Sequence, residues 1–434
     1  MTKPRDYQLR AIEQMRAALV DARSVVYVLP TGGGKTVVFC EMIRRAAAKG
    51  KRALTLVHRV ELLSQTVRAL FRAGVVPGVL SAGAPPPQSD VVVAMIPTLS
   101  KRIKSDDAGL KPFDLVVVDE AHHAPADTYK IIVDAFPCAK IVGVTATPIR
   151  QDGKGLGDVF EKMVLGPSVR ELIRDGYLSD FVVYAPKVFA AQVDFADGKK
   201  KKKKLYEHPV SAFKQRFGDE KTAIVFCESV KRCLELEKKF NAAGVAAKAV
   251  YGGMPEERRA AVLADLGDKK IKVVVSCNVV SEGVDVPSVD GVVLARPTES
   301  LALYLQQVGR ALRVAPGKEK ALIVDLVGNV LRHGMPDAEF VWTLQGVQKP
   351  PPREKQPGQT QNAKSFARET VLAKENERGL VEIDAQTLAS MPYRIAISML
   401  HTPAQLAMYA KLKGYKRGWV WHRMREMQAK QTEK

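Results

Sequence analysis

Short runs of valine, isoleucine and leucine recur through most of this sequence, and stretches of helical length separate them. The first series, between Ser24 and about Asp180, reads SVVYVLP, ALTLVH, DVVVAMI, DLVVVDE and KIVGVTAT. A second series begins near Lys221 and reads TAIVFCE, AAKAVYG, IKVVVSC, GVVLARP and KALIVDL. Strands that are apolar on both faces must be covered on both faces, which is typical of parallel sheets flanked by helices. The pattern therefore predicts two tandem α/β domains.

The segments outside these two series set the predicted boundaries. A first domain covers residues 1–180 and a second covers residues 221–345. Residues 181–220 are predicted to be a linker, because the six consecutive lysines Lys199–Lys204 repel one another and favour a solvated loop over a phosphate clamp. Residues 346–378, rich in Pro and Gln, form a second predicted linker. Residues 379–434 are basic and helical in pattern, and are predicted to form a small, mainly helical domain.

The chain is strongly basic. Lys and Arg number 67 against 47 Asp and Glu, so the 434 residues carry a net charge of +20. An excess of this size predicts a polyanionic partner, nucleic acid rather than a membrane. A basic surface that serves only solubility is the alternative.

The five cysteines are scattered, and no two of them have C-x-x-C spacing. This argues against a zinc ribbon or a disulfide scaffold and favours a reducing cytoplasm. The sequence shows neither the apolar core of a signal peptide nor an uncharged run long enough to span a bilayer. We expect a cytoplasmic monomer.

A glycine-rich stretch, VYVLPTGGGKTVVF, lies between the first apolar run and a helix-forming segment. Its glycines let backbone N–H groups surround phosphates, and the helix N-terminus adds its positive end. Lys35 is placed to reach the β- and γ-phosphates, and the Thr36 hydroxyl to bind Mg²⁺. The strict pattern has glycine where Leu29 stands, but its core is intact. The predicted ATP-binding residues here are Thr31, Gly32, Gly33, Gly34, Lys35 and Thr36.

The stretch DLVVVDEAHH places two carboxylates at the end of a buried strand, where ligands bind in open α/β sheets. Asp119 is predicted to hold Mg²⁺, and Glu120 to orient and deprotonate the attacking water. His122 is predicted to sense the γ-phosphate or the neighbouring domain, whereas His123 is expected at the surface. Thr145 and Thr147 lie at the end of another predicted strand, and their hydroxyls could connect the carboxylates to the domain interface.

The second series contains YLQQVGRALR, in which Arg310 and Arg313 are spaced to lie on one helical face. Phosphoryl transfer needs cations where charge develops on the γ-phosphate, and arginines from a second domain make hydrolysis depend on domain closure. We therefore predict that both are catalytic. The alternative, a pair of arginines in surface ion pairs, is weakened by the phosphate loop and DEAH stretch elsewhere in the chain.

At these separations TGGGKT, DEAH, TAT and QQVGRALR resemble motifs I, II, III and VI of superfamily two helicases of the DEAH type. The wider pattern is similar to RadD-like bacterial and phage DNA helicases. The resemblance implies two RecA-like domains, ATP and Mg²⁺ as cofactors, and a nucleic acid partner in a bacterial cell or a phage-infected host.

The resemblance also implies roles for residues outside the central motifs. PRDYQ matches the adenine-recognising Q-motif through Arg5 and Gln8, and Gly283 and Asp285 match a loop that contacts the ribose. Gln306 of motif VI joins the predicted nucleotide contacts. The matching nucleic-acid contacts are Arg59, Gln65, Thr98 and Ser276, and Glu61 lies within the same motif as Arg59.

The function implied is an ATP-dependent DNA helicase or translocase acting in repair, recombination or replication. Only a short stretch, Ser288 to Leu305, is available for a strand-separating hairpin, which favours translocation over vigorous unwinding. An RNA-dependent ATPase shares every motif above. A nucleic-acid-binding adaptor with a vestigial ATP site is a second alternative, opposed by the intact motif residues.

The segment GYKRGWVWHRMREM near the end of the chain holds Trp419 and Trp421, two of its three tryptophans. Residues two apart on a helix point in well-separated directions, so one tryptophan can anchor the small domain while the other is exposed. An exposed aromatic ring among cations suits stacking on a base. Packing of both rings in a core is the alternative. The predicted contacts are Lys416, Arg417, Trp421 and Arg423.

Overall fold

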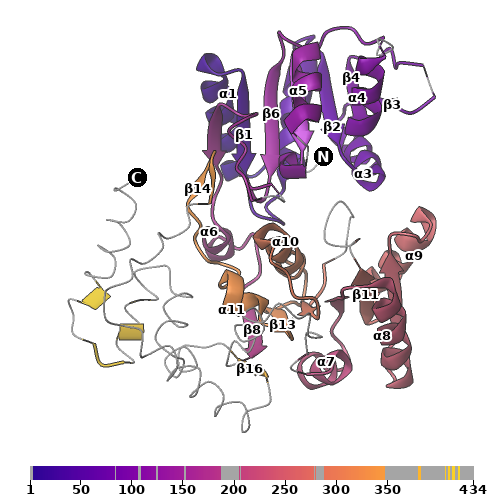
Figure 1. The fold of residues 1–434 in the computed structure, drawn as a ribbon, viewed down its shortest axis with the longest axis vertical. Coiled ribbons are helices and arrows are strands. Elements are labelled where there is room, and N and C mark those ends of the chain that lie inside the picture. Colours follow the sequence, from indigo (N-terminus) through magenta and orange to yellow (C-terminus); the bar gives the residue numbers. More distant parts are fainter. Residues whose placement is uncertain are drawn as a thin grey trace, which may run out of the picture.

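The computed structural model describes two α/β domains, one above the other (Figure 1). The described residues are 3–83, 85–105, 109–123, 126–150, 153–186, 205, 207–277, 279 and 288–347, then 380–382, 406, 409–410, 413–415 and 419–420. Several predicted features lie outside these ranges: Lys199–Lys204, Gly283, Asp285, Lys416, Arg417, Trp421 and Arg423. Among the described residues, no helix has the length and apolar character that crossing a membrane requires.

The first domain holds a seven-stranded sheet in the order β3-β4-β2-β5-β6-β1-β7, and every pairing in it is parallel. Its strands are β1 (Ser24–Val28), β2 (Ala53–Val57), β3 (Gly78–Leu80), β4 (Val91–Met95), β5 (Leu115–Asp119), β6 (Lys140–Thr145) and β7 (Lys162–Leu165). Central strands such as β1 and β5 are buried along their whole length, as the apolar runs predict.

Helices cover both faces of this first sheet because alternate strand residues point to opposite sides. The helices α1 (Asp6–Asp21), α2 (Lys35–Ala47) and α3 (Val60–Arg72) pack with Val25 and Val117 on one face. On the other face, α4 (Ile96–Lys104) and α5 (Ala126–Ala135) pack with Val26 and Val116.

The second domain repeats this plan with the order β10-β11-β9-β12-β13-β8-β16, in which only the β16–β8 pairing is antiparallel. Its strands are β8 (Phe181–Pro186), β9 (Ala223–Phe226), β10 (Ala247–Tyr251), β11 (Val273–Cys277), β12 (Gly291–Leu294), β13 (Ala321–Asp325) and β16 (Leu380–Glu382). The helices α7 (Pro209–Phe217) and α8 (Val230–Ala242) cover one face. The helices α9 (Glu256–Gly267) and α10 (Leu301–Ala311) cover the other, and α11 (Asn329–His333) follows β13.

The prediction of a linker over residues 181–220 needs correction at both ends. Phe181–Pro186 is β8, which pairs in parallel with β13, and Pro209–Phe217 is α7, whose Phe213 and Phe217 are buried. The connection between the two sheets therefore lies earlier in the chain, between β7 and β8, and contains α6 (Val169–Arg174). The prediction failed here because β8 is only partly buried, so its hydrophobic pattern is weak, and because the lysine run nearby indicates a solvated loop.

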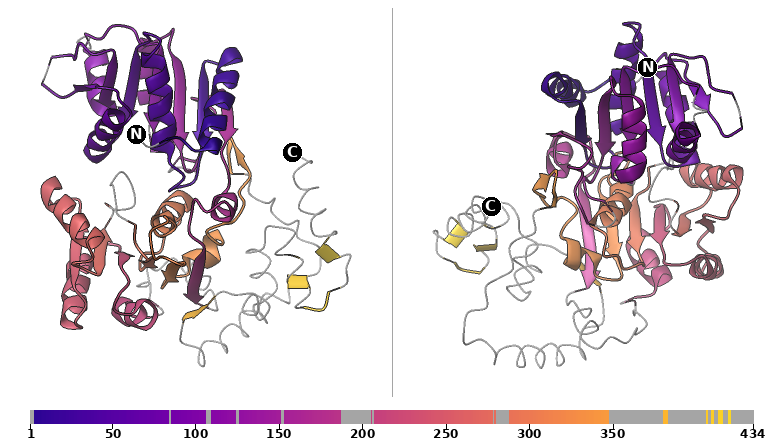
Figure 2. Two further views of the ribbon diagram at one scale, coloured as in Figure 1. Left: turned by 180° about the vertical axis from the view of Figure 1, so that it is seen from behind. Right: turned by 45° about the horizontal axis from the view of Figure 1, so that its top comes forward.

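A hairpin returns from the end of the second domain to the first domain (Figures 1 and 2). It is formed by β14 (Trp342–Thr343) and β15 (Gly346–Val347), and the Gly157 N–H donates to the Leu344 carbonyl over 2.7 Å. A Cβ at Gly155 would lie 2.1 Å from the same carbonyl oxygen, so only glycine permits this approach. The hairpin thus joins the two domains a second time.

Candidate active site between the two domains

The phosphate loop connects β1 to α2 at the carboxyl edge of the first sheet. Gly32 and Gly34 have φ values of 88° and 85°, a left-handed conformation that favours glycine. A Cβ on Gly33 would lie 2.7 Å from the Leu29 side chain, which is fully buried. Leu29, the departure from the strict pattern, therefore fits because Gly33 has no side chain.

Gln8 holds the phosphate loop in this structure. Its side chain is 2% exposed, and its amide N–H groups donate to the carbonyls of Gly33 (3.1 Å) and Gly34 (3.4 Å). Its carbonyl oxygen accepts from the Arg5 backbone N–H at 2.9 Å, and the Tyr7 hydroxyl also donates to Gly33. These contacts engage both ends of the Gln8 amide, so in this structure Gln8 connects the phosphate loop to the backbone before α1.

Arg5 lies beside the loop but faces an aromatic ring. Its guanidinium is 4.5 Å from the centre of the Tyr177 ring, and it donates to the Tyr7 hydroxyl at 3.2 Å. The Tyr7 and Tyr177 rings are 5.1 Å apart. Sequence reasoning missed both tyrosines; Tyr7, directly before Gln8, had a signal in its position, whereas Tyr177 had none.

Lys35 and the two carboxylates meet at the mouth of the loop. The Lys35 amine is 3.6 Å from the Glu120 carboxylate, and Asp119 accepts from the Glu120 N–H at 2.9 Å. Glu120 has a φ of 47°, an uncommon conformation for a non-glycine residue. Burial raises the pKa of Asp119 to about 7, and the Glu120 charge adds to the rise while Lys35 opposes it.

The donor set fits Mg²⁺. Asp119 is 5% exposed at the end of β5, and Thr36 is the second residue of α2, so the site offers a carboxylate and a hydroxyl from the same sheet edge. Magnesium prefers such oxygen ligands and usually takes few of them from the protein. A cation beside Asp119 would also favour the ionised carboxylate that burial opposes.

His122 connects both domains through its two ring nitrogens. The Thr145 hydroxyl donates to the Thr147 carbonyl (3.0 Å), so it accepts from the Nδ1–H of His122 (2.8 Å). Nε2 of His122 then accepts from the Gln306 amide at 3.4 Å. With Nδ1 as the donor to Thr145, this network brings a side chain of the second domain onto the DEAH stretch.

The arginine segment lies directly against the phosphate loop. A Cβ on Gly309 would be 2.6 Å from Thr31, and Arg310 is 6% exposed within α10. One premise was wrong: α10 ends at Ala311, so Arg313 does not share its helical face and instead forms a strand-like bridge with Leu178. The chain nevertheless returns the Arg313 side chain to within 3.7 Å of where a Cβ on Gly32 would lie.

Lys318 supports this segment from behind. Its amine donates to the carbonyls of Val289 (2.6 Å) and Arg313 (2.9 Å), and also to that of Ala311, the last residue of α10. Burial lowers the pKa of the Lys318 amine to about 8. The sequence around it, PGKEK, is typical of an exposed turn, so nothing in it predicted a buried helix cap.

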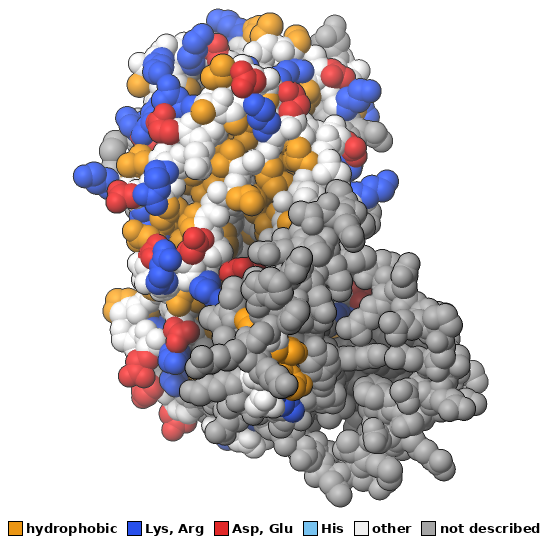
Figure 3. All heavy atoms as spheres, turned by 90° about the vertical axis from the view of Figure 1, so that its left-hand side faces the viewer, with side chains coloured by type: hydrophobic (Ala, Val, Ile, Leu, Met, Phe, Trp, Pro, Cys, Tyr) orange, Lys and Arg blue, Asp and Glu red, His pale blue; other side chains and the backbone are white. Residues whose placement is uncertain are grey.

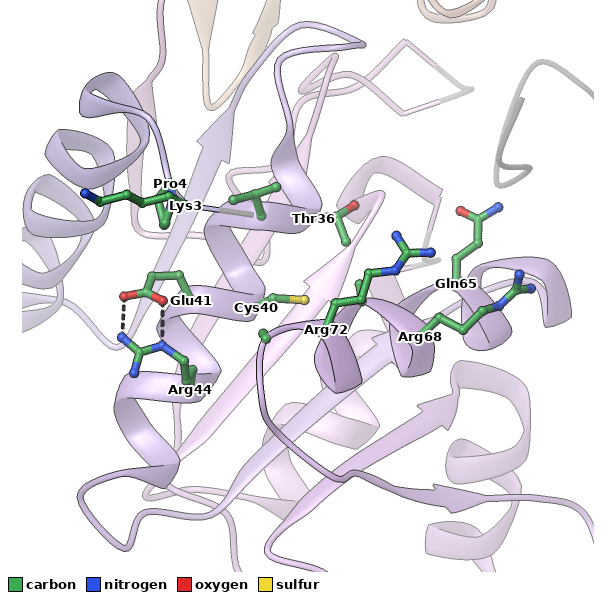
Figure 4. Close-up of a pocket in the computed structure, with 12 residues that line it drawn as sticks. Lys3, Pro4, Thr36, Cys40, Glu41, Arg44, Gln65, Arg68 and Arg72 are labelled. Carbon is green, nitrogen blue, oxygen red and sulfur yellow. Dashed lines mark hydrogen bonds and ion pairs between the residues drawn. The ribbon is translucent and has the colours of Figure 1, made fainter. Parts of the chain in front are cut away.

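A cavity of about 670 Å³ opens beside Thr36, between α2 and α3 (Figure 4). Thr36 and Cys40 line it from α2, Gln65, Arg68 and Arg72 line it from α3, and Lys3 and Pro4 lie at its edge. On α2, Glu41 forms an ion pair with Arg44. Its volume and its position next to the phosphate loop suit a nucleoside.

The predicted nucleic-acid contacts lie in different environments. Arg59 caps the N-terminus of α3, Gln65 lies on the same helix, and Thr98 is half-buried in the first turn of α4. Ser276 is 1% exposed inside β11, so its side chain is not accessible to a nucleic-acid strand in this arrangement. Farther along, the Trp419 ring packs 4.8 Å from Tyr415 and 6.1 Å from Tyr409.

A further contact between the domains, away from the nucleotide site, was not predicted. Glu61 of α3 forms an ion pair with Arg259 of α9, and both side chains are largely buried. The pair lines a cavity of about 390 Å³ that also contains Gln65 and Arg68.

Comparisons with known proteins cover most of the chain. Residues 1–150 match the family of the res subunit of type III restriction enzymes, and residues 200–315 match the conserved C-terminal domain of helicases. A 51.5 kDa protein of a Lactococcus phage is 31% identical over 322 residues, which are 72% of this chain and 68% of the phage protein. The DNA 3′–5′ translocase XPB2 of Sulfurisphaera tokodaii is 25% identical, over 74% of this chain and 81% of its own.

The chain spans only 51% and 58% of the length of two yeast helicases that it also matches. Among solved structures, the ATP-dependent type ISP restriction-modification enzyme LlaBIII bound to DNA has the same fold, with a TM-score of 0.54 and 19% identity. That likeness covers 75% of this chain and 28% of LlaBIII. The chain belongs to the superfamily 2 helicases, ATP-hydrolysing enzymes built on two RecA-like domains.

Proposed function

We propose that this chain is a DNA translocase that hydrolyses ATP between its two domains to move along or remodel DNA. The observation that carries the proposal is the seating of the second domain on the phosphate loop, through Gly309 against Thr31 and Gln306 against His122. Residues that would bind ATP and residues that would complete its hydrolysis come from different domains. Movement between the domains and hydrolysis are therefore coupled in this proposal.

In the proposed reaction the phosphates lie on the loop from Gly32 to Lys35, and the nucleoside enters the cavity beside Thr36. Lys35 turns from Glu120 to the phosphates, which releases the Glu120 carboxylate to orient and deprotonate the attacking water. Thr36 and Asp119 would hold Mg²⁺, which neutralises charge on the phosphate oxygens when it is bound.

Arg310 and Arg313 stabilise the charge that develops on the γ-phosphate. Because both belong to the second domain, they act only while the domains are closed. His122 reports this closure, since Gln306 reaches its Nε2 atom from the same segment as the arginines. Opening after hydrolysis would separate Gln306 from His122 and withdraw the arginines together.

DNA is proposed over RNA because the archaeal relative is a DNA translocase and the first domain matches a restriction-enzyme family. The charge of +20 supplies general attraction to phosphates, and contacts to the backbone carry little sequence preference. Repair, recombination or replication are the processes in which such a motor would act.

The test compares ATP hydrolysis by the purified full chain with single-stranded DNA, duplex DNA, branched DNA and RNA of matched length. We expect DNA to raise the turnover rate well above the RNA and nucleic-acid-free rates. Greater stimulation by RNA would identify an RNA-dependent ATPase instead. Nucleic-acid binding without hydrolysis under any condition would identify an adaptor, and either result would refute the proposal.

A further inference from the structure

Three histidine rings lie in a row between the nucleotide site and the beginning of α3. The His122 and His123 ring centres are 4.1 Å apart, and those of His123 and His58 are 4.3 Å apart. The ring planes are tilted by 40° and 31° relative to each other, and at these separations the rings are in close contact. His123, which the sequence placed at the surface, is the middle ring.

The two ends of the histidine row lie at different sites: His122 at the domain interface beside Glu120, and His58 at the beginning of α3. His122 is 3% exposed and touches Thr145 of the first domain and Gln306 of the second. His58 follows β2 directly and precedes Arg59, the residue that caps α3 and is predicted to contact nucleic acid. The row exists because β2 and β5 are neighbours, with Leu56 opposite Val118, so the residues after each strand emerge side by side.

We propose that His58 and His123 are positioning residues that transmit nucleic-acid binding at the beginning of α3 to the hydrolytic site. A strand that binds Arg59 would move the backbone at His58, and the stacked rings would carry that shift through His123 to His122. The latter contacts both Glu120, with Nδ1 3.5 Å from the carboxylate, and Gln306. The inference rests on the proposed function, since it concerns stimulation of ATP hydrolysis by nucleic acid.

Close ring contact is the property that this role needs. Packed side chains shift together because interiors have few voids that could absorb a displacement. A ring of similar size at position 58 or 123 should therefore preserve coupling even without its nitrogens. Removing a ring should leave the nucleotide site itself in place, because neither His58 nor His123 contributes an atom to the phosphate, metal or arginine contacts described above.

The experiment measures ATP turnover by the full chain with and without a thymidine oligonucleotide, for wild type, His58→Ala, His123→Ala, His58→Phe and His123→Phe. We expect all five to keep the basal rate, and the alanine variants to lose roughly fivefold or more of the stimulated rate, the lower end of typical coupling between sites. The phenylalanine variants should keep most of it. His208→Ala, which removes an imidazole at the beginning of α7, is the control and should match wild type.

Thermal unfolding of each variant reports whether the fold is intact, and the phenylalanine variants keep the test valid if an alanine variant does not fold. Full stimulation in folded alanine variants would overturn this inference alone. Phenylalanine variants as defective as the alanine variants would also overturn it, because ring contact would then not be the cause. No stimulation of the wild type by any nucleic acid would refute the proposed function as well.

Discussion

Glu61 and Arg259 form an ion pair that joins α3 of the first domain to α9 of the second. Glu61 is the second residue of α3, two residues after Arg59, so the pair lies on the predicted path of a nucleic-acid strand. In Figure 2 the two helices face each other across the domain boundary. A bound phosphate would compete with the Glu61 carboxylate for Arg259.

Glu61→Gln should therefore strengthen binding of single-stranded DNA, because it removes a carboxylate and frees Arg259 for a phosphate. Each added phosphate contact on a single strand steepens the dependence of log affinity on log salt by about 0.7. Fluorescence anisotropy of a labelled oligonucleotide across a KCl series measures both quantities. Glu13→Gln, the same charge change in an exposed pair on α1, is the control. Equal salt slopes for wild type and Glu61→Gln would contradict this prediction.

Glu120→Gln should bind ATP but hydrolyse it about 10²- to 10⁴-fold more slowly, the usual contribution of a general base. Lys35→Ala should lose hydrolysis and also weaken nucleotide binding, since it removes the phosphate contact. Single-turnover hydrolysis and titration with a fluorescent nucleotide separate these two effects. Lys51→Ala, which removes an exposed amine paired with Asp114, should behave as wild type. Normal turnover by Glu120→Gln would show that the base is misassigned.

Arg310→Ala should retain ATP binding and lose about 10³-fold or more in hydrolysis, as expected for an arginine supplied by a second domain. Arg313→Ala should show the same separation of binding from hydrolysis. The nucleotide titration and the turnover assay are again sufficient, with Arg16→Ala on the exposed surface of α1 as the control. Hydrolysis at the wild-type rate would exclude the catalytic role.

Gln8→Ala should impair ATP and GTP hydrolysis by the same factor, because both ends of the Gln8 amide already bind backbone groups of the loop and of Arg5. If Gln8 instead reads adenine, the preference for ATP over GTP would fall in the variant. The ratio of kcat/KM for the two nucleotides distinguishes these roles. Gln215→Ala on α7 of the second domain is a matched control.

Lys318 predicts a pH dependence of stability. Burial lowers the pKa of its amine to about 8 from an ordinary value of 10.5, so between these pH values the unfolded chain binds more protons than the folded one. The stability of wild type relative to Lys318→Met should therefore rise from pH 8 to pH 10. Urea midpoints at three pH values measure it, and a constant or falling difference would contradict the assigned burial effect.

Much of the site could be predicted because it depends on local order in the chain. Lys35 and Asp119 stand at the ends of apolar runs, and parallel strands bring such ends to one edge wherever the strands lie in the sheet. The same reasoning gave both domains, but it failed at Phe181–Pro186, where a strand that is only partly buried precedes a polar run. Half-burial weakens the hydrophobic pattern on which strand prediction depends.

The parts that were not predicted are contacts between distant segments. Tyr177 meets Arg5 across more than 170 residues of chain, and Glu61 meets Arg259 only after both domains have formed and docked. None of these residues has a neighbour in sequence that signals its partner. For Arg313 the prediction relied on a local pattern that does not hold. Its spacing from Arg310 would place both on one helical face, but α10 ends at Ala311.

The side of the molecule that carries the hairpin also has an apolar pocket at the domain boundary. Leu165 of the edge strand β7, Phe340 and Trp342 line it. Figure 3 shows this side, with apolar side chains gathered on the first domain. The hairpin that contains Trp342 reaches Gly155 here, and α6 connects the domains nearby (Figure 1).

The α6 connection and the hairpin attach the domains to each other along one edge, as a hinge would. A rotation of the domains about a line through the hairpin and the α6 connection would keep the backbone contact at Gly157, whereas sliding would break it. Displacement grows with distance from that line, and α3 and α9 lie on the opposite side from the hairpin (Figure 1). We therefore expect a small closure at the phosphate loop to become a longer stroke at α3 and α9, where the DNA would be held.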